Sequence, residues 1–392
     1  MSDQMFDVAI VGAGLVGSSL ALALRGSGLS IALIEARMPP PAPPDAGWDH
    51  RIYAISPSSA NFLAQLGVWP ALPAERMARI EAMVIYGDDG SARLDFSAYE
   101  AGLAQLAYIV ENRVLQAALW HALNIQSGVT LFCPAACAAL QIAQDAARLS
   151  LDDGRQIAAK LIVAADGAHS WVREHAAIEA RDKDYRQRGV VANFATELAH
   201  GGTAYQWFRP DGVLAYLPLP GNRISIVWSL QQDLANTLLQ LPAVELCERV
   251  AEASGRCLGK LELITPAAAF PLHLIEPERL VKPRLALIGD AAHQVHPLAG
   301  QGVNLGFADA RVLAAVLAGR GARDCGDNLL LRRYERARRE EILAMQLVTD
   351  GLQGLFNQAQ PVLRWARNTG LGLTNRLAWV KRQLVKQALG RI

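Results

Sequence analysis

The chain is poor in cysteine and almost free of net charge. Its 392 residues include five cysteines, and 38 lysines and arginines nearly balance 37 aspartates and glutamates, so the net charge is +1. A sparse, odd set of cysteines is typical of a protein in a reducing cytosol and not of a disulfide-stabilised one. A balanced charge without a basic run argues against nucleic acid as a partner.

The patterns of a membrane-spanning, secreted or zinc-binding protein are also missing. No apolar run is both long enough and free enough of glycine to span a bilayer. The apolar stretch from Val8 is broken by glycines and shows no cleavage site. Cys133 and Cys137 are close, but no Cys-x-x-Cys or histidine pair accompanies them, so we expect no metal site. We therefore predict a soluble, cytoplasmic protein.

The clearest motif lies at the start of the chain. A predicted strand leads directly into Gly12-Ala-Gly14-Leu-Val-Gly17, an apolar helix and a second predicted strand that ends on Glu35. This is the dinucleotide fingerprint: Gly12 permits a tight turn, Gly14 lets a pyrophosphate approach the backbone, and Gly17 lets helix and strand pack closely. A carboxylate at Glu35 favours a ribose 2′-hydroxyl over a 2′-phosphate, so we expect FAD or NAD rather than NADP.

A similar unit lies at 285–310. The apolar run from Leu285 to Ile288 predicts a buried strand, Gly289-Asp290 ends it, and a glycine-rich loop leads into an apolar helix from about Val303. Backbone N–H groups at such a helix start can face a ligand. Asp290, at the strand end, could hold a ribityl or ribose hydroxyl.

Asp166 repeats the arrangement of Asp290, because Asp166-Gly167 follows the apolar run from Leu161 to Ala164. A lone aspartate at a strand end beside a helix start is often only a helix cap. The chain has this arrangement twice, after strands that could belong to one sheet. We therefore favour a shared ligand.

Other stretches predict elements around these sites. Alternating residues between 185 and 275 predict an antiparallel sheet, which could cover an apolar pocket. Ser56-Pro57 predicts the start of a helix, and a further helix is predicted from Val110 to Ala122. We expect Asp49-His50-Arg51 to form an exposed basic spot. The last segment, from Pro361 to Ile392, is basic and amphipathic, so it could lie on an anionic membrane, bind a partner or pack on the chain itself.

Several motifs together resemble a known family. GAGLVG at 12–17, ADGAHSWVR at 165–173 and ALIGDAAH at 286–293 resemble the single-component flavin monooxygenases of the para-hydroxybenzoate hydroxylase superfamily. Within it, DHRIYAISPSS at 49–59, VENRVLQAAL at 110–119 and VHPLAGQGVNLGFAD at 295–309 resemble the ubiquinone-biosynthesis hydroxylases, the UbiH/UbiF/UbiI/VisC type.

The resemblance implies a fold class and a division of the chain. The expected fold is α/β, with a Rossmann-like FAD-binding domain that has a parallel sheet, an inserted antiparallel-sheet substrate domain and a C-terminal helical region. The expected boundaries place the FAD-binding domain in 1–75, 109–182 and 279–355, the substrate domain in 76–108 and 183–278, and the helical tail in 356–392.

The resemblance also implies an activity. An aromatic ring of a polyprenylated phenol or quinol would be hydroxylated through a flavin C4a-hydroperoxide, with FAD as cofactor, NAD(P)H as reductant and O2 as co-substrate. The basic tail would bring the protein to a membrane surface or a ubiquinone-biosynthesis complex, which gives a location in the cytoplasm or at the periphery of the inner membrane. The family includes several paralogous hydroxylases, so the hydroxylated ring carbon stays open.

Residue roles follow from the resemblance by position. Gly12, Gly14 and Gly17 would face the FAD pyrophosphate and Glu35 the adenosine ribose. Arg113 would lie against the FAD phosphates and Arg51 near the pyrophosphate; Asp290 would bind the ribityl or phosphate end, and Asp166 would support the same region. The residues expected beside the isoalloxazine are Pro297, Gly300, Gly302, Val303 and Asn304. No side chain is identified as a catalytic base.

Three other functions compete with this prediction. The closest is hydroxylation of a small soluble phenol. The others are an FAD oxidoreductase without oxygen insertion and a non-catalytic flavin-binding subunit. A single glycine fingerprint in context argues against a second, stable nicotinamide-binding domain, so the reductant would bind transiently.

Overall fold

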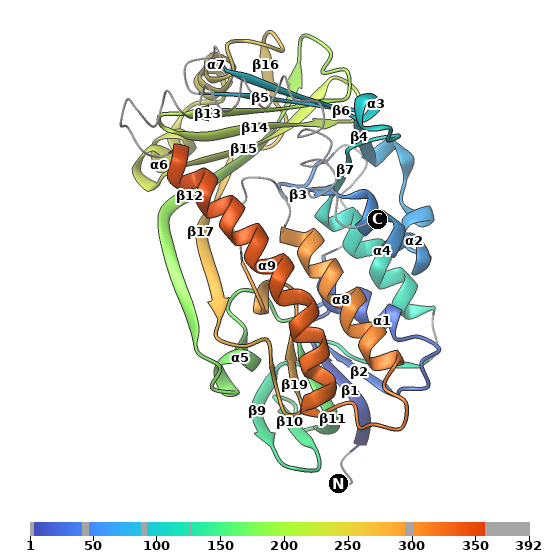
Figure 1. The fold of residues 1–392 in the computed structure, drawn as a ribbon. Coiled ribbons are helices and arrows are strands. Elements are labelled where there is room, and N and C mark those ends of the chain that lie inside the picture. Colours follow the sequence, from blue (N-terminus) through green and yellow to red (C-terminus); the bar gives the residue numbers. More distant parts are fainter. Residues whose placement is uncertain (1–3, 41–46, 88–91, 126–127, 295–301, 357–392) are drawn as a thin grey trace.

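The computed structural model describes the chain apart from residues 1–3, 41–46, 88–91, 126–127, 295–301 and 357–392, and apart from the side chains after residue 345. A lower part contains one sheet and the longest helices, and an upper part contains a second sheet (Figure 1). Two long strands run from one part to the other.

The lower sheet has eight described strands, and its central strands are parallel. The strands lie in the order β18-β19-β11-β1-β2-β8, with the β9–β10 hairpin paired to β11. Strands β1, β2, β11 and β19 each contain a continuously apolar, buried stretch, as expected of strands that are covered on both faces. In chain order the eight strands are β1 (Gln4–Val11), β2 (Ile31–Ile34), β8 (Val129–Phe132), β9 (Cys137–Ile142), β10 (Ala147–Leu151), β11 (Gln156–Ala164), β18 (Val281–Lys282) and β19 (Leu285–Leu287).

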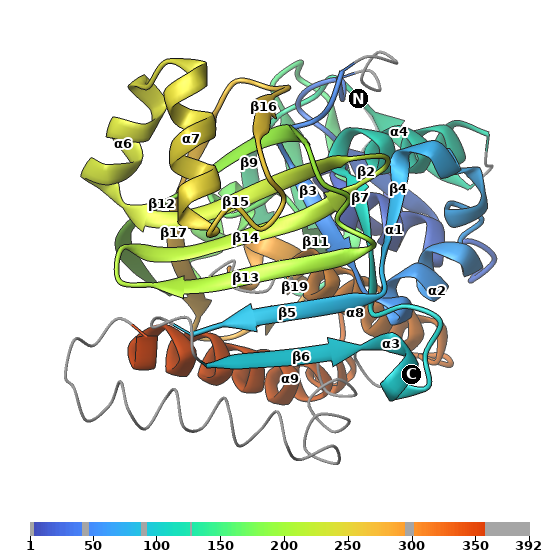
Figure 2. The ribbon, with the colours of Figure 1, turned by 90° about the horizontal axis from the view of Figure 1, so that it is seen from above.

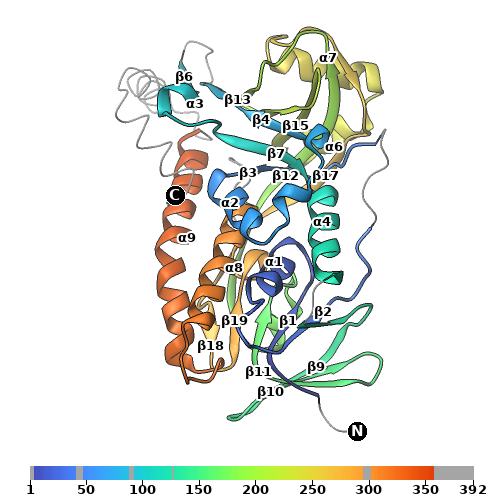
Figure 3. The ribbon, with the colours of Figure 1, turned by 90° about the vertical axis from the view of Figure 1, so that its right-hand side faces the viewer.

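Four helices lie side by side against this sheet (Figure 3). They are α1 (Leu15–Ala23), α4 (Asn112–Asn124), α8 (Gly302–Ala318) and α9 (Asn328–Phe356). Helix α1 packs between α4 and α8, and α9 packs on α8. The shorter helices of the lower part are α2 (Pro57–Gln65), α5 (Trp171–His175) and the 3-10 turns η1 (Trp69–Ala71), η2 (Ala74–Arg76) and η3 (Gly289–Ala291).

The upper sheet is mainly antiparallel, as predicted, and its strands lie in the order β16-β12-β15-β14-β13-β5-β6, with β17 paired to β12 (Figure 2). One pair, β13 with β5, is parallel. The strands are β5 (Ala82–Tyr86), β6 (Arg93–Ser97), β12 (Ala180–Thr196), β13 (Thr203–Arg209), β14 (Gly212–Leu219), β15 (Arg223–Gln231), β16 (Leu261–Leu263) and β17 (Ala268–Pro277). A short helix, α3 (Ala98–Ala101), follows β6.

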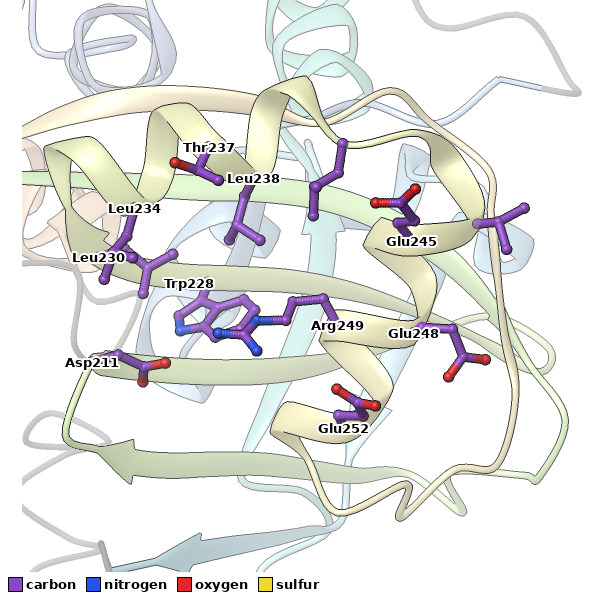
Figure 4. Close-up of a pocket in the computed structure, with 12 residues that line it drawn as sticks. Asp211, Trp228, Leu230, Leu234, Thr237, Leu238, Glu245, Glu248, Arg249 and Glu252 are labelled. Carbon is purple, nitrogen blue, oxygen red and sulfur yellow. The ribbon is translucent and has the colours of Figure 1, made fainter.

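The outer face of the upper sheet has a core of its own. Helices α6 (Gln232–Gln240) and α7 (Ala243–Ala253) cover it, and Trp207, Tyr216 and Trp228 are buried there. A hollow of about 410 Å³ lies between these helices and is lined by Trp228, Leu238 and Arg249 (Figure 4). These aromatic residues therefore build the outer core of the upper part and do not line its junction with the lower one.

A small third sheet joins the two parts. It consists of β3 (Ile52–Ile55), β4 (Met77–Ile80) and β7 (Ala107–Glu111), with β7 in the middle. The predicted helix start at Val110 was wrong, because β7 pairs with both neighbours through Val110 and α4 begins only at Asn112. The predicted start of α2 is confirmed: the Ser56 hydroxyl accepts a hydrogen bond from the amide of Ser59.

A buried polar network ties this small sheet to the upper one. The Asp49 amide donates to Glu111 at 2.7 Å, and Glu111 pairs with Arg76, also at 2.7 Å. The side-chain amide of Asn193, on β12, donates to the Asp49 carbonyl at 2.9 Å. The Asp49 carboxylate in turn accepts the amide of Arg113 at 2.9 Å, which caps the start of α4.

This network corrects the expectation for Asp49-His50-Arg51. We predicted an exposed basic spot, but Asp49 is only 8% exposed and His50 contacts the carbonyl of Pro266 at 2.8 Å. Only Arg51 of the three is exposed. The reason is that the Asp49 carboxylate accepts hydrogen bonds from two amides, one of its near neighbour Arg51 and one of Arg113, which is 64 residues away.

Replacing Glu111 with Ala should lower the free energy of unfolding by about 3–5 kcal/mol, because it leaves the largely buried Arg76 guanidinium without its carboxylate. Urea unfolding followed by circular dichroism measures the change. Glu340→Ala, at an exposed position of α9, is the control and should change the value by about 0.5 kcal/mol or less. A Glu111→Ala effect as small as the control would show that the network does not hold the parts together.

Candidate functional site

The glycine loop between β1 and α1 has the geometry that its motif predicts. Gly12 has a φ of +101°, and a Cβ there would lie 2.4 Å from the carbonyl oxygen of Ala165. A Cβ on Gly17 would lie 1.9 Å from the carbonyl oxygen of Gly12. In contrast, a Cβ on Gly14 would meet no described atom within 4 Å. The loop is thus closed where the fold needs contact and open at Gly14.

Two side chains hold this loop from outside. The Glu35 carboxylate, at the end of β2, accepts the amide of Ala13 at 2.7 Å. From α4, the side-chain amide of Gln116 donates to the carbonyl of Ala13 at 2.7 Å. Sequence reasoning singled out Glu35 and missed Gln116, which carries no signal beyond its place in a predicted helix.

The ends of three neighbouring parallel strands bring the motifs together. Strands β1, β11 and β19 are adjacent in the sheet, so Gly12, Asp166 and Asp290 follow strand ends at one edge. The side chain of Val16, on α1, packs closely against the turn η3 and against helix α8. A Cβ built on Gly289 of η3 would lie 3.2 Å from it, and a Cβ built on Gly306 of α8 would lie 2.5 Å from it. Ligands of open α/β sheets bind at this edge.

Asp166 caps a helix. Its two carboxylate oxygens accept hydrogen bonds from the hydroxyl of Ser170 at 2.6 Å and from the amide of Val172 at 3.0 Å, in the first turn of α5. Burial raises the pKa of Asp166, and these hydrogen bonds oppose the rise. Arg173 of the same helix donates to the carbonyl of Ala291 at 2.9 Å. Asp166 and Arg173 therefore hold the loop after β11 against the turn η3.

Asp290 is accessible but largely surrounded by protein. Solvent reaches this residue, which is exposed in the structure. Desolvation nevertheless raises the pKa of Asp290, and the charges of His293 and Arg51 oppose that rise. The guanidinium of Arg51 lies 5.0 Å from the ring of Phe270 on β17. A solvent-accessible carboxylate that is otherwise surrounded by protein is placed to accept hydrogen bonds from the hydroxyl groups of a ligand.

The start of α8 lies against β3 and α2. The Asn304 side chain donates to the carbonyl of Ala54 at 2.8 Å and accepts the amide of Ser56 at 2.9 Å. Gly302 and Val303 form the first turn of the helix. Pro297 and Gly300, predicted to run beside the isoalloxazine, lie outside the described residues.

These residues fit a dinucleotide such as FAD. The glycine loop leaves Gly14 open to a pyrophosphate, Glu35 lies against the same loop, and Asp290 is accessible at the neighbouring strand end. In the part of the chain that the structure describes, no group of three or more histidine, cysteine or acidic residues could hold a metal ion. The arrangement is that of a cofactor site built from backbone and carboxylates.

Comparisons with known proteins agree with this geometry. A family model described as "FAD binding domain" matches residues 5–349. The chain is 39% identical to the 3-demethoxyubiquinol 3-hydroxylase of Escherichia coli, over 100% of both chains. It is 38% identical to the ubiquinone hydroxylase UbiL of Rhodospirillum rubrum, over 100% of this chain and 91% of the relative. The crystal structure of p-nitrophenol 4-monooxygenase PnpA from Pseudomonas putida has a TM-score of 0.79 at 19% identity, with 100% of both chains covered, so it shares the fold.

Replacing Gly14 and Gly12 separately should distinguish ligand contact from folding. Gly14→Ala should leave the thermal stability of the apoprotein unchanged and weaken FAD binding, because its methyl group meets no described atom and would occupy the space that the fingerprint assigns to a pyrophosphate. Gly12→Ala should lose both, because its methyl group meets the backbone of Ala165. Circular dichroism and titration of flavin fluorescence measure the two properties. Unchanged FAD affinity in Gly14→Ala would place the pyrophosphate elsewhere.

Proposed function

Because the chain belongs to the FAD-binding family and, within it, to the ubiquinone-biosynthesis hydroxylases, we propose that it hydroxylates the aromatic ring of a polyprenylated phenol or quinol. The observation that carries the proposal is the 39% identity to a 3-demethoxyubiquinol 3-hydroxylase along the whole of both chains. The predicted FAD cofactor is confirmed by the family match over 5–349, and the predicted family is confirmed by that match together with the full-length relatives. The substrate, the reductant NAD(P)H and the assigned site residues belong to the proposal.

In this proposal the chain binds FAD along one edge of the lower sheet. Gly12, Gly14 and Gly17 face the pyrophosphate and Glu35 the adenosine ribose. Arg113 and Arg51 balance the phosphate charge. Asp290 accepts hydrogen bonds from hydroxyl groups of the ribityl chain. Asp166 supports this region of the site by holding the loop after β11.

The first turn of α8 is assigned to the flavin ring. Gly302, Val303 and Asn304 present backbone N–H groups at the start of a helix, where the helix dipole stabilises negative charge on a reduced flavin. Pro297 and Gly300 precede this turn and are assigned to the same side by the family motif. Bound FAD supplies the oxygen activation, and the chain's own task is to orient the ring and exclude water.

The junction of the two parts offers an apolar surface for the substrate. Ile52 and Ala54 on β3, and Met83 and Leu217 of the upper sheet, pack against one shared apolar cluster and are only partly buried. An aromatic ring with an apolar tail gains by covering such side chains, at roughly 25 cal/mol per Å² of apolar area. A small, charged phenol would gain much less there.

Purified protein loaded with FAD should oxidise NADH or NADPH faster when a detergent-solubilised polyprenylated hydroquinone is added. The expected product is heavier by one oxygen atom in mass spectrometry, with matching O2 uptake. The control substrate is the same hydroquinone without its polyprenyl tail. Turnover of the control alone would favour a soluble phenol as the substrate. Oxidation of NAD(P)H without substrate-dependent O2 uptake would contradict a hydroxylase.

We also propose that the basic segment 361–392 brings the enzyme to its lipid substrate. No helix among the described residues is long and apolar enough to cross a membrane, and a basic amphipathic segment can lie on an anionic surface. Truncation at Pro361 should reduce co-sedimentation with anionic vesicles and leave FAD bound. Vesicles of neutral lipid are the control, and loss of folding or of FAD on truncation would instead give the segment a structural role.

A further inference from the structure

A buried charged cluster lies beside the turn that carries Asp290. It consists of His293, Asp309 on α8 and Arg338 on α9, each with at most 2% of its surface exposed. The Asp309 carboxylate accepts the amide of Gly289 at 2.8 Å, lies 2.6 Å from Nε2 of His293 and lies 2.6 Å from Nε of Arg338. The Asp309 carboxylate therefore joins the turn η3, His293 and helix α9.

Arg338 connects Asp309 to two helices. Its Nη2 donates to the carbonyl of Leu305 on α8 at 3.2 Å, and its Nη1 pairs with Glu341, one turn further along α9. These contacts use the planar fork of the guanidinium, which a lysine cannot reproduce. The rotation of the Asp309 side chain is thus fixed from α9.

The contacts of Asp309 lead to Asp290. Gly289, which precedes Asp290, has a φ of +60° and is held through its amide. His293 has one ring nitrogen beside Asp309, while its buried Nδ1 has no hydrogen-bond partner among the described residues. Burial raises the pKa of Asp290, and the nearby His293 opposes that rise, so His293 and Asp290 interact electrostatically.

Stability alone gives a weak reason for such a cluster. Apolar side chains of similar volume often replace a buried ion pair without loss of stability. The charges of this cluster meet at the turn that carries Asp290, the proposed cofactor contact. Their arrangement therefore bears on the position of Asp290 as well as on stability.

We propose that Asp309 and Arg338 are positioning residues of the FAD site, which hold the Gly289–Asp290 turn and His293 in the arrangement that binds the cofactor. The inference rests on the proposed placement of FAD at Asp290. It assigns to α9, which is remote in sequence from the glycine fingerprint, a part in cofactor affinity.

The test compares two single variants with their combination. Asp309→Asn keeps the shape of the side chain without its charge, and Arg338→Met keeps the apolar stem without the guanidinium. Each single variant removes one half of the buried Asp309–Arg338 pair and leaves the other half without that partner, so both the melting temperature of the apoprotein and the FAD affinity should fall, the latter on the order of tenfold. The double variant has no unpaired member of the pair, so its melting temperature should recover while FAD affinity stays low.

The readouts are circular dichroism of the apoprotein, flavin fluorescence titration and the visible spectrum of bound flavin. Recovery of FAD affinity together with melting temperature in the double variant would show a purely structural cluster and overturn the proposal. If the double variant does not fold, His293→Gln decides, because it leaves the Asp309–Arg338 pair and the Gly289 contact intact. Unchanged FAD affinity in that variant would also overturn the proposal.

Two controls separate this inference from the proposed function. Arg339→Met, at the exposed neighbour of Arg338, should change neither property. Asp290→Asn should weaken FAD binding without lowering the melting temperature. If Asp290→Asn binds FAD normally, the proposed placement of FAD is wrong. If Asp290→Asn is weak and the double variant binds normally, only the positioning role is wrong.

Discussion

The close approach of α1, the turn η3 and α8 is the constraint on which the site depends. A Cβ on Gly306 would lie 2.5 Å from Val16, and one on Gly289 3.2 Å from the same side chain. On the other side, Gly12 approaches the backbone of Ala165. Because glycine alone permits these contacts, three parallel strands can end at one edge, with their loops turned toward a common ligand.

Two buried polar clusters fix what surrounds that edge. Asp49, Glu111 and Arg76, with Asn193 of β12, join the small sheet to the upper one, and Asp309 with Arg338 joins η3 to α9. In both, a carboxylate is buried and paired with an arginine and also accepts a backbone amide. Paired in this way, buried charges define one arrangement of the chain around them.

Much of the fold could be predicted because it depends on local patterns. The continuously apolar strands, the cap at Ser56 and the glycine fingerprint each depend on a few neighbouring residues, and the structure has them at the predicted places. The roles of polar residues were harder to predict. Asp49 was expected on the surface and is buried, and Asp166 uses its carboxylate to cap α5. The pairing of Asp309 with Arg338 gave no sequence signal, because charged residues on helices usually face solvent.

The sequence by itself determined the order of elements, the glycine positions and the family. The tertiary structure decided which polar groups meet: Asn304 holds Ser56 across 248 residues, and Arg338 holds Asp309 across 29. The physical reason is the range of the interactions. Backbone preference and hydrophobic periodicity act over one or two turns of chain, whereas the partner of a buried charge is set by packing of distant elements.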